Sequence, residues 1–135
     1  MVKQVELAVR SRLDDMLRPA GITALQYTAL TVLERHPDLT SAQLARNSFV
    51  TAQSMSDMVT ALHAQGLIKR TRDPADGRRL VLALSAAGRR LVTRFRPKVA
   101  ALEAEMLSGL STRQSTELRR SLASCRNALA ADPPR

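Results

Sequence analysis

Apolar residues recur every three or four positions along most of this chain of 135 residues, which is the spacing of one helical face. Four segments with this pattern come first, at about residues 3–18, 24–36, 41–47 and 51–65. Threonines with capping potential begin the last three segments (Thr23, Thr40 and Thr51). Gly66 ends the fourth. Because the third and fourth segments are short and only a few residues apart, they predict a helix-turn-helix.

After Gly66 the pattern changes to that of strands. Residues 67–72 are a plausible strand, and residues 73–77 (Asp-Pro-Ala-Asp-Gly) are dense in turn-forming residues. Residues 78–84 alternate, which places Leu80, Leu82 and Leu84 on one face. A helix pair followed by a hairpin with a basic tip predicts a winged helix-turn-helix, in which the hairpin is the wing.

Two more helices are predicted after the hairpin. Ser85 caps the first, and Pro97 within it predicts a bend or a local break near Arg96. Ser111 and Gln114 have the spacing of a capping box and open the second. We therefore expect one mainly α domain, residues 1–135, with about six helices and a small β-hairpin.

Within this domain, residues 22–84 are the predicted winged lobe, and residues 1–20 and 85–135 are the predicted helical dimerisation region. The outer helices carry apolar stripes that 135 residues cannot bury in a second lobe of one chain. We expect them to pack against a second copy as an intertwined twofold homodimer. The expected contacts are Val5, Val9 and Leu13 in the first helix and Leu118, Leu122, Cys125 and Leu129 in the last.

The net charge of the chain and its distribution indicate which class of molecule the protein binds. Twenty-one Lys and Arg residues against 12 Asp and Glu residues give a formal net charge of +9. Residues 69–98 hold ten of the basic and two of the acidic residues, so they supply most of this excess. Such a block is typical of nucleic-acid binding, although a solvated surface would have the same composition. One Tyr and two Phe residues offer few platforms for stacking single-stranded bases, so duplex DNA is favoured.

Several other classes are disfavoured by the residues present. No run approaches the ~20 apolar residues of a membrane span. The N-terminal segment has no uninterrupted apolar core and carries Glu6, Asp14 and Asp15, so it is unlike a secretory signal. A single cysteine agrees with a reducing, cytoplasmic location. No phosphate-binding glycine loop or nucleophile–base spacing suggests an enzyme. His36 and His63 are far apart in sequence and lack companions at ligand spacing, so we expect no metal or other cofactor.

The hairpin and its flanks resemble the MarR family of bacterial transcription regulators. Residues 73–79 (Asp-Pro-Ala-Asp-Gly-Arg-Arg) are similar to the family's Asp-x-Arg wing, and residues 84–88 (Leu-Ser-Ala-Ala-Gly) to its Leu-Ser/Thr-x-x-Gly motif. The helix-turn-helix spacing from Leu44 to Ile68 also agrees. Phe49 stands where the family usually has Gly, and Asp57 where it often has Arg.

This resemblance implies a dimeric transcription regulator, a repressor or an activator, with a recognition helix over about residues 51–65. It implies that Asp76 holds the hairpin while Arg78 enters a minor groove. It also implies a small anionic or phenolic effector that releases DNA, and in some branches control by oxidation. The family's pocket lies where the winged lobe meets the dimer helices, and here its candidate residues are Met16, Tyr27 and Leu30.

A helix in the major groove presents its outward residues to base edges. The candidates here are Thr51, Ala52, Gln53, Ser54, Ser56, Asp57 and Thr60. Gln53 can bond adenine through both amide atoms, and Asp57 either accepts from a cytosine amino group or is a surface charge paired with a basic neighbour. Phosphate or wing contacts are expected from Ser41, Gln43, Lys69, Arg70, Arg72, Asp76, Arg78 and Arg79.

Two alternatives to a ligand-released, sequence-reading repressor remain open from the sequence. One is an architectural winged-helix protein that binds duplex DNA without sequence preference. The other is a redox-responsive regulator that uses Cys125. Because Cys125 falls on the stripe from Leu118 to Leu129, we favour packing at the dimer seam for its side chain.

Overall fold

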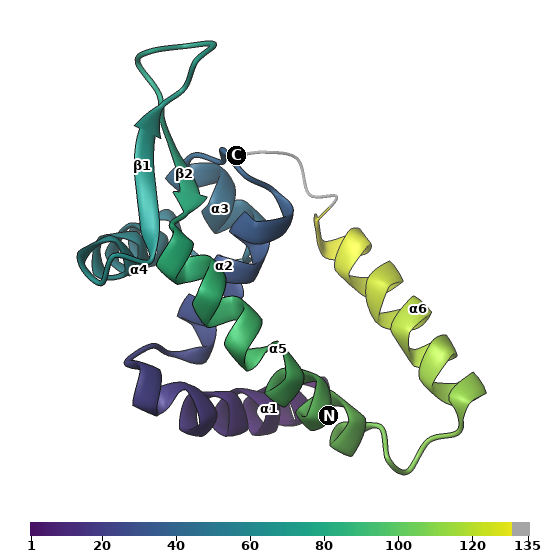
Figure 1. Cartoon of the computed structure of the whole chain (residues 1–135). Helices are drawn as coiled ribbons and strands as arrows, with labels where there is room; N and C mark the ends of the chain where they lie inside the picture. The colour runs from purple at the N-terminus through teal and green to yellow at the C-terminus, as the bar shows by residue number, and fades with distance from the viewer. Residues whose placement is uncertain (131–135) are drawn as a thin grey trace. The chain divides into compact units, whose positions relative to one another are not determined.

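The computed structural model describes residues 1–130 (Figure 1). Contacts divide the chain into two compact units, Met1–Val99 and Ala100–Arg135. The elements are α1 (Val2–Leu17), the short 3-10 helix η1 (Arg18–Ala20), α2 (Ala24–Arg35), α3 (Ser41–Asn47), α4 (Ala52–Ala64), β1 (Ile68–Arg72), β2 (Leu80–Leu84), α5 (Ala86–Met106) and α6 (Thr112–Ala130). Over residues 1–130, six α-helices and one two-stranded hairpin confirm the predicted fold class.

The helix starts follow the predicted capping residues. At α2 the Gln26 N–H donates to Thr23 Oγ1 (3.1 Å) while the Thr23 N–H donates to Gln26 Oε1 (2.9 Å). The same reciprocal pair forms between Thr40 and Gln43 at α3, and between Ser111 and Gln114 at α6. Each capping box satisfies backbone donors that the first turn of a helix leaves free.

The ends of α3 and α4 are closed by the same backbone arrangement. At α4 the Gly66 N–H donates to His63 O and the Leu67 N–H to Leu62 O, with Gly66 at φ +73°. At α3 the Phe49 N–H donates to Arg46 O and the Val50 N–H to Ala45 O. Both are Schellman motifs, which need a left-handed residue one position beyond the cap. These two ends set the turn between α3 and α4 and the exit from α4 into the hairpin.

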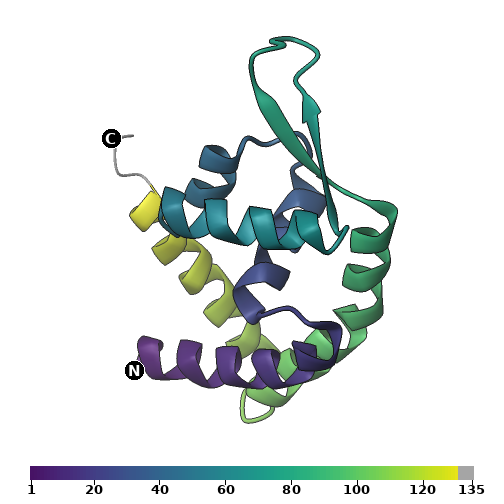
Figure 2. The same ribbon diagram turned by 90° about the vertical axis from the view of Figure 1, so that its left-hand side faces the viewer.

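The hairpin leaves the C-terminal end of α4 and extends beyond α2, α3 and α4 (Figure 2). β1 and β2 are antiparallel, with Ile68 opposite Leu84 and Arg72 opposite Leu80. On its other edge β2 forms a bridge with Leu39, where the Leu82 N–H donates to Leu39 O (2.8 Å). The base of the hairpin is therefore fixed on both edges of β2.

The predicted alternation in the second strand is only partly right. Leu82 and Leu84 are buried, but Leu80 is half exposed and Val81 is buried. Leu80 lies at the turn end of β2, whereas the base of the strand lies against α2 and the Leu39 segment. Because strict alternation requires one solvated face, it fails where a strand is covered on more than one side.

A serine joins the wing to the end of α4. Ser85 Oγ donates to Gly66 O (2.6 Å) and accepts from the Gly88 N–H (3.0 Å), and the Ser85 N–H donates to Leu67 O (3.1 Å). A Cβ at Gly88 would lie 2.1 Å from Leu67 O. These contacts explain the Leu-Ser-x-x-Gly motif. The serine caps α5, and the glycine has no side chain, so α5 can pack closely against the backbone of Leu67.

One hydrophobic core lies under α2, α3, α4, the hairpin base and the first half of α5. Leu30, Leu33, Leu44, Met55 and Phe95 are among its fully buried side chains. Arg96 Nη2 on α5 contacts both carboxylate oxygens of Glu34 on α2, at 2.5 and 2.6 Å. α5 is therefore held to the winged lobe by apolar packing and by one ion pair.

Of the bend or local break predicted near Arg96, the break is wrong. α5 runs from Ala86 to Met106 without interruption and keeps Pro97 inside it. Pro97 is exposed, so its ring projects to solvent, and the packing of Phe95 and Val99 on either side holds the helix in place.

In the second unit, Arg119 of α6 pairs with Glu103 (3.1 Å), and none of the 19 residues of α6 is buried.

The close approach at Gly88 gives a stability prediction. Gly88→Ala lowers the free energy of unfolding by about 2 kcal/mol or more, because a Cβ at 2.1 Å forces α5 away from Leu67. Gly77→Ala is the matched control, since nothing lies within 4 Å of the position that a Cβ would take there, and it changes stability by about 0.5 kcal/mol at most. Urea unfolding of both variants measures the difference, and equal midpoints would contradict this account of the joint.

Candidate nucleic-acid interface

α4 presents a polar face to solvent. Its buried residues are Met55, Val59 and Leu62, which pack into the core. All of the outward candidates on this helix and at its cap are exposed: Thr51, Ala52, Gln53, Ser54, Ser56, Asp57 and Thr60. The structure therefore brings these predicted DNA-contact residues together on one surface.

Several of these side chains already have partners within α4. Thr51 Oγ1 accepts from the Ser54 N–H (3.1 Å) and donates to Ser54 Oγ (2.9 Å). Thr60 Oγ1 donates to Ser56 O (3.0 Å). Gln53 Nε2 donates to Asp57 Oδ1 (3.2 Å), so Asp57 is paired with an amide rather than with a basic neighbour. The sequence alone did not reveal this pairing, although the i, i+4 spacing permits it.

The turn before α4 contains a strained residue. Phe49 has φ +57° and is 57% exposed. For a residue with a side chain, this left-handed conformation costs about 1–2 kcal/mol, which is why glycine is usual there. Phe49 thus adopts the left-handed conformation that the Schellman motif at the end of α3 requires.

At the start of α3, the side chain of Gln43 is committed to the capping box through its oxygen. Only its Nε2 group remains to donate elsewhere. Ser41 is half buried in the first turn of the same helix. Contact of these two residues with phosphate stays a prediction.

The tip of the wing is held by its aspartates. Asp76 Oδ1 accepts from the Arg78 N–H (3.1 Å), and Asp73 Oδ1 accepts from the Ala75 N–H (2.9 Å). Arg72 Nη1 donates to Gly77 O (2.7 Å) across the hairpin. Asp76 therefore acts on the backbone of the turn, and Arg72 is partly occupied in bracing it.

Four basic side chains of the hairpin project freely. Within residues 1–130, no hydrogen bond or ion pair is found for the side chains of Lys69, Arg70, Arg78 and Arg79, and all four are exposed. Lys69 and Arg70 lie in β1, near the base of the hairpin, and Arg78 and Arg79 lie at its tip. Unpaired cations on a rigid hairpin next to a polar helix face are suited to phosphate and groove contacts.

The predicted effector residues lie in the core. Leu30 and Tyr27 are buried and Met16 packs against the same cluster. Burial raises the pKa of the Tyr27 phenol above its ordinary value. Their contact with an effector stays a prediction.

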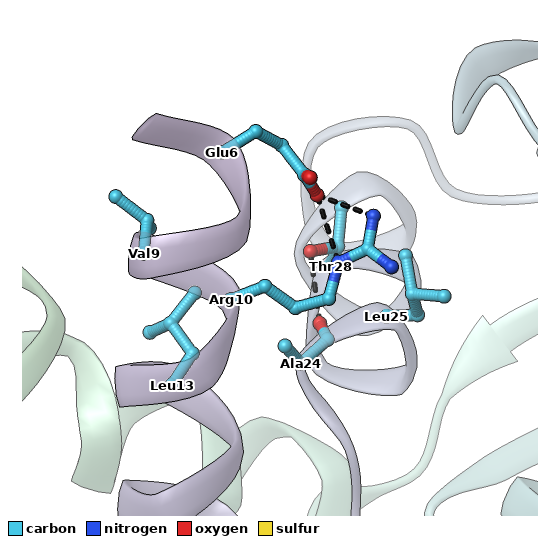
Figure 3. Close-up of a pocket in the computed structure, with 7 residues that line it drawn as sticks. All are labelled: Glu6, Val9, Arg10, Leu13, Ala24, Leu25 and Thr28. Carbon is cyan, nitrogen blue, oxygen red and sulfur yellow. Dashed lines mark hydrogen bonds and ion pairs between the residues drawn. The ribbon is translucent and has the colours of Figure 1, made fainter. Parts of the chain in front are cut away.

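A cavity of about 280 Å³ lies between α1 and α2 (Figure 3). It is lined by Glu6, Val9, Arg10, Leu13, Ala24, Leu25 and Thr28, none of which is among the predicted effector residues. Arg10 Nε donates to Glu6 Oε1 (2.7 Å), and the hydrogen bonds from Arg10 lower the pKa of Glu6 below its ordinary value. Sequence reasoning missed this cavity because the spacing of Val9 and Leu13 fits a helix–helix contact equally well.

The predicted dimerisation residues are largely uncovered in the single chain. Val5 is 48% exposed, Leu122 47% and Leu129 73%, and Cys125 is exposed as well. Val9, Leu13 and Leu118 are half buried. These side chains are thus accessible or partly accessible on α1 and α6, and their burial between two copies stays a prediction.

Metal-binding clusters and membrane-spanning helices are both absent from residues 1–130. In that range no three His, Cys, Asp or Glu side chains gather where they could hold a metal ion. No helix there combines the length and the apolar character needed to cross a membrane.

The chain is similar to known proteins in both sequence and fold. The sequence profile described as the MarR family matches residues 20–79. The HTH-type (helix-turn-helix) transcriptional repressor Rv2887 of Mycobacterium tuberculosis is 33% identical over 122 residues, which are 90% of this chain and 88% of that protein.

Solved structures share the fold. MepR of S. aureus, in a complex with DNA, has a TM-score of 0.82 at 24% identity and covers 94% of both chains. CouR of Rhodococcus jostii RHA1, bound to p-coumaroyl-CoA, has a TM-score of 0.83 at 22% identity, over 99% of this chain and 92% of that one. Because the chain shares the fold, carries the wing motif and aligns with a relative over nearly its whole length, it belongs to the MarR family of winged helix-turn-helix transcription regulators.

Proposed function

We propose that this regulator is a cytoplasmic, dimeric repressor that binds a pseudo-palindromic operator in double-stranded DNA and is released by a small ligand. The observation that carries the proposal is the pairing of two surfaces: the exposed polar face of α4 and the anchored wing with free Arg78 and Arg79. Similarity to a protein named as a repressor supports the sign of regulation.

In this proposal α4 lies in the major groove, where its outward side chains meet base edges. The wing tip follows the adjacent minor groove, in which Arg78 finds the negative potential of narrow A·T tracts. Lys69 and Arg70 contact the backbone and contribute salt-dependent affinity without sequence preference. The related fold of MepR in complex with DNA is compatible with this arrangement.

Arg78→Ala is expected to weaken operator binding by about 1–3 kcal/mol, roughly five- to 150-fold in Kd, because a groove contact is lost. Arg113→Ala removes the same charge from an exposed position at the start of α6 and should leave Kd within about twofold. Fluorescence anisotropy at fixed salt measures both. If the two variants weaken binding equally, Arg78 supplies only bulk charge.

The dimer is inferred from the uncovered stripes. On α6, Leu118, Leu122, Cys125 and Leu129 recur at spacings of four, three and four, so they share one face of a helix that buries no residue within the chain. Val5 is similarly uncovered on α1. Contiguous apolar surface of this kind is characteristic of an interface, and a second copy offers the same surface by symmetry.

Leu122→Glu is expected to shift the protein to monomers at micromolar concentration, because it places a charge in the apolar seam. Asn127→Glu is the control, since position 127 lies on the opposite face of α6 and should leave the dimer intact. Sedimentation velocity distinguishes the two species. A wild-type chain that sediments as a stable monomer would contradict the proposed dimer.

This placement of Cys125 bears on the redox alternative. Its side chain shares the stripe with Leu122 and Leu129, so a dimer seam would cover the thiol and restrict access of peroxide. We therefore assign Cys125 to packing. Peroxide-triggered release of DNA that is lost in Cys125→Ser would reverse this assignment.

The effector is proposed to be a small anionic or phenolic molecule. The cavity between α1 and α2 supports a small-molecule site, since it is mainly apolar (Figure 3). Its wall carries Arg10 and Glu6 as an ion pair, so an anionic ligand would have to replace Glu6 as the partner of Arg10. CouR, which shares the fold, was solved with p-coumaroyl-CoA, the thioester of a phenolic acid. Met16, Tyr27 and Leu30, the effector contacts that the resemblance implies, lie in the hydrophobic core or against it, and their contact with a ligand stays a prediction.

A panel of phenolic carboxylates and their thioesters, added to the preformed DNA complex, tests the effector. At least one compound should raise the Kd for DNA by about tenfold or more. Leu25→Trp fills the cavity and should abolish this response while DNA binding persists. A response that is unchanged in Leu25→Trp would place the effector elsewhere.

A further inference from the structure

Asp57 carries an acidic charge on the surface proposed to face DNA. It is the single Asp or Glu in α4, and it is exposed. A carboxylate near phosphates weakens binding to every duplex, whatever its sequence. Within residues 1–130 no basic side chain pairs with it. Neutralisation by a neighbour therefore does not account for its presence.

The partner of Asp57 is the side-chain amide of Gln53, one helical turn earlier. Gln53 Nε2 donates one of its two hydrogens to Asp57 Oδ1 at 3.2 Å. Gln53 Oε1 and the second N–H remain available, and these are the acceptor and donor that match the N6 and N7 edge of adenine. The hydrogen bond thus restricts the long glutamine side chain without using up its reading edge.

The neighbouring side chains of α4 leave Gln53 as the main long side chain that can contact a base edge. Ser54 is bonded to Thr51, and Ala52 has no polar group. Gln53 has the longest outward side chain in the first two turns of α4, and it would sample many rotamers if unsupported. Pre-ordering such a side chain reduces the entropy that binding must otherwise remove.

We propose that Asp57 is a positioning residue: it orients the Gln53 amide for one base pair, and this gain at one site offsets the affinity that its charge removes from binding to every duplex. The orientation of Gln53 raises the ratio of specific to non-specific affinity, whereas the charge weakens binding to both kinds of DNA. The inference rests on the proposed function, because it assumes that α4 reads base edges. It replaces the two interpretations of Asp57 that the sequence suggests, a direct cytosine contact and a charge paired with a basic residue.

Three variants separate the hydrogen bond from the charge. Asp57→Asn retains an oxygen that can accept from Gln53 but loses the charge. Asp57→Ala loses both the hydrogen bond and the charge, and Gln53→Ala removes the side chain that is proposed to contact the base pair. Glu117→Gln is the control, because it removes an exposed acid from α6. Each protein is titrated with a selected operator, with all single base-pair substitutions in one half-site, and with random duplex DNA at several salt concentrations.

The expected result is that Asp57→Asn binds random duplex several-fold more tightly and keeps its discrimination at the base pair that Gln53 reads. Asp57→Ala should gain the same non-specific affinity but lose roughly tenfold discrimination at that base pair alone. The variant with both Gln53→Ala and Asp57→Ala should discriminate no less than Gln53→Ala. Glu117→Gln should change neither quantity.

Other outcomes overturn the inference. If Asp57→Ala changes affinity by one factor at every base pair, Asp57 is a surface charge only. If Asp57→Asn loses discrimination as Asp57→Ala does, the charge acts directly and the hydrogen bond does not. If discrimination in Asp57→Ala changes at a base pair that Gln53→Ala leaves unaffected, Asp57 reads a base itself. A wild-type protein that binds operator and random duplex equally refutes the proposed function as well.

Discussion

The Ser85 hydroxyl holds the wing to the end of α4, and the geometry of the proposed DNA surface depends on it. Its two hydrogen bonds, to Gly66 O and from the Gly88 N–H, close the junction where α4, the hairpin and α5 meet. Gly88 makes the junction possible because no side chain fits against Leu67 O. With the hairpin base also bridged to Leu39, the base of the wing is fixed relative to the polar face of α4. Groove binding by two elements at once requires such rigidity, since ordering a loose wing on binding would cost conformational entropy.

Local rules explain how much of this fold could be predicted from the sequence. Capping boxes and the glycine stop at Gly66 act within four residues of each other, so their outcome does not depend on the rest of the chain. Predictions failed where distant segments decide the result. Val81 is buried because α2 and the Leu39 segment cover β2, and α5 passes Pro97 intact because its neighbours pack into the core. A periodic pattern cannot report which of its faces a remote element will cover.

The candidate site shows the same division. The outward set on α4 followed from its helical period once Met55, Val59 and Leu62 were assigned to the core, and the structure has all three buried. The hydrogen-bond partners of those outward side chains could not be predicted from the sequence, because each side chain has several rotamers and each rotamer allows different hydrogen bonds. The Gln53–Asp57 bond, the bracing of Gly77 by Arg72 and the occupation of Gln43 in a cap change which atoms are free to meet DNA. Charge density alone, by contrast, would suit an architectural binder equally well.

The central claim is that two copies of this chain read DNA sequence together. Selection of genome fragments by the purified protein, followed by the mass of the complex on the enriched site, tests it most directly. The account predicts an inverted repeat with half-sites about one helical turn apart, bound by two chains. Uniform recovery of fragments with a steep dependence on salt would contradict it, because a protein held by phosphates alone has no preferred site.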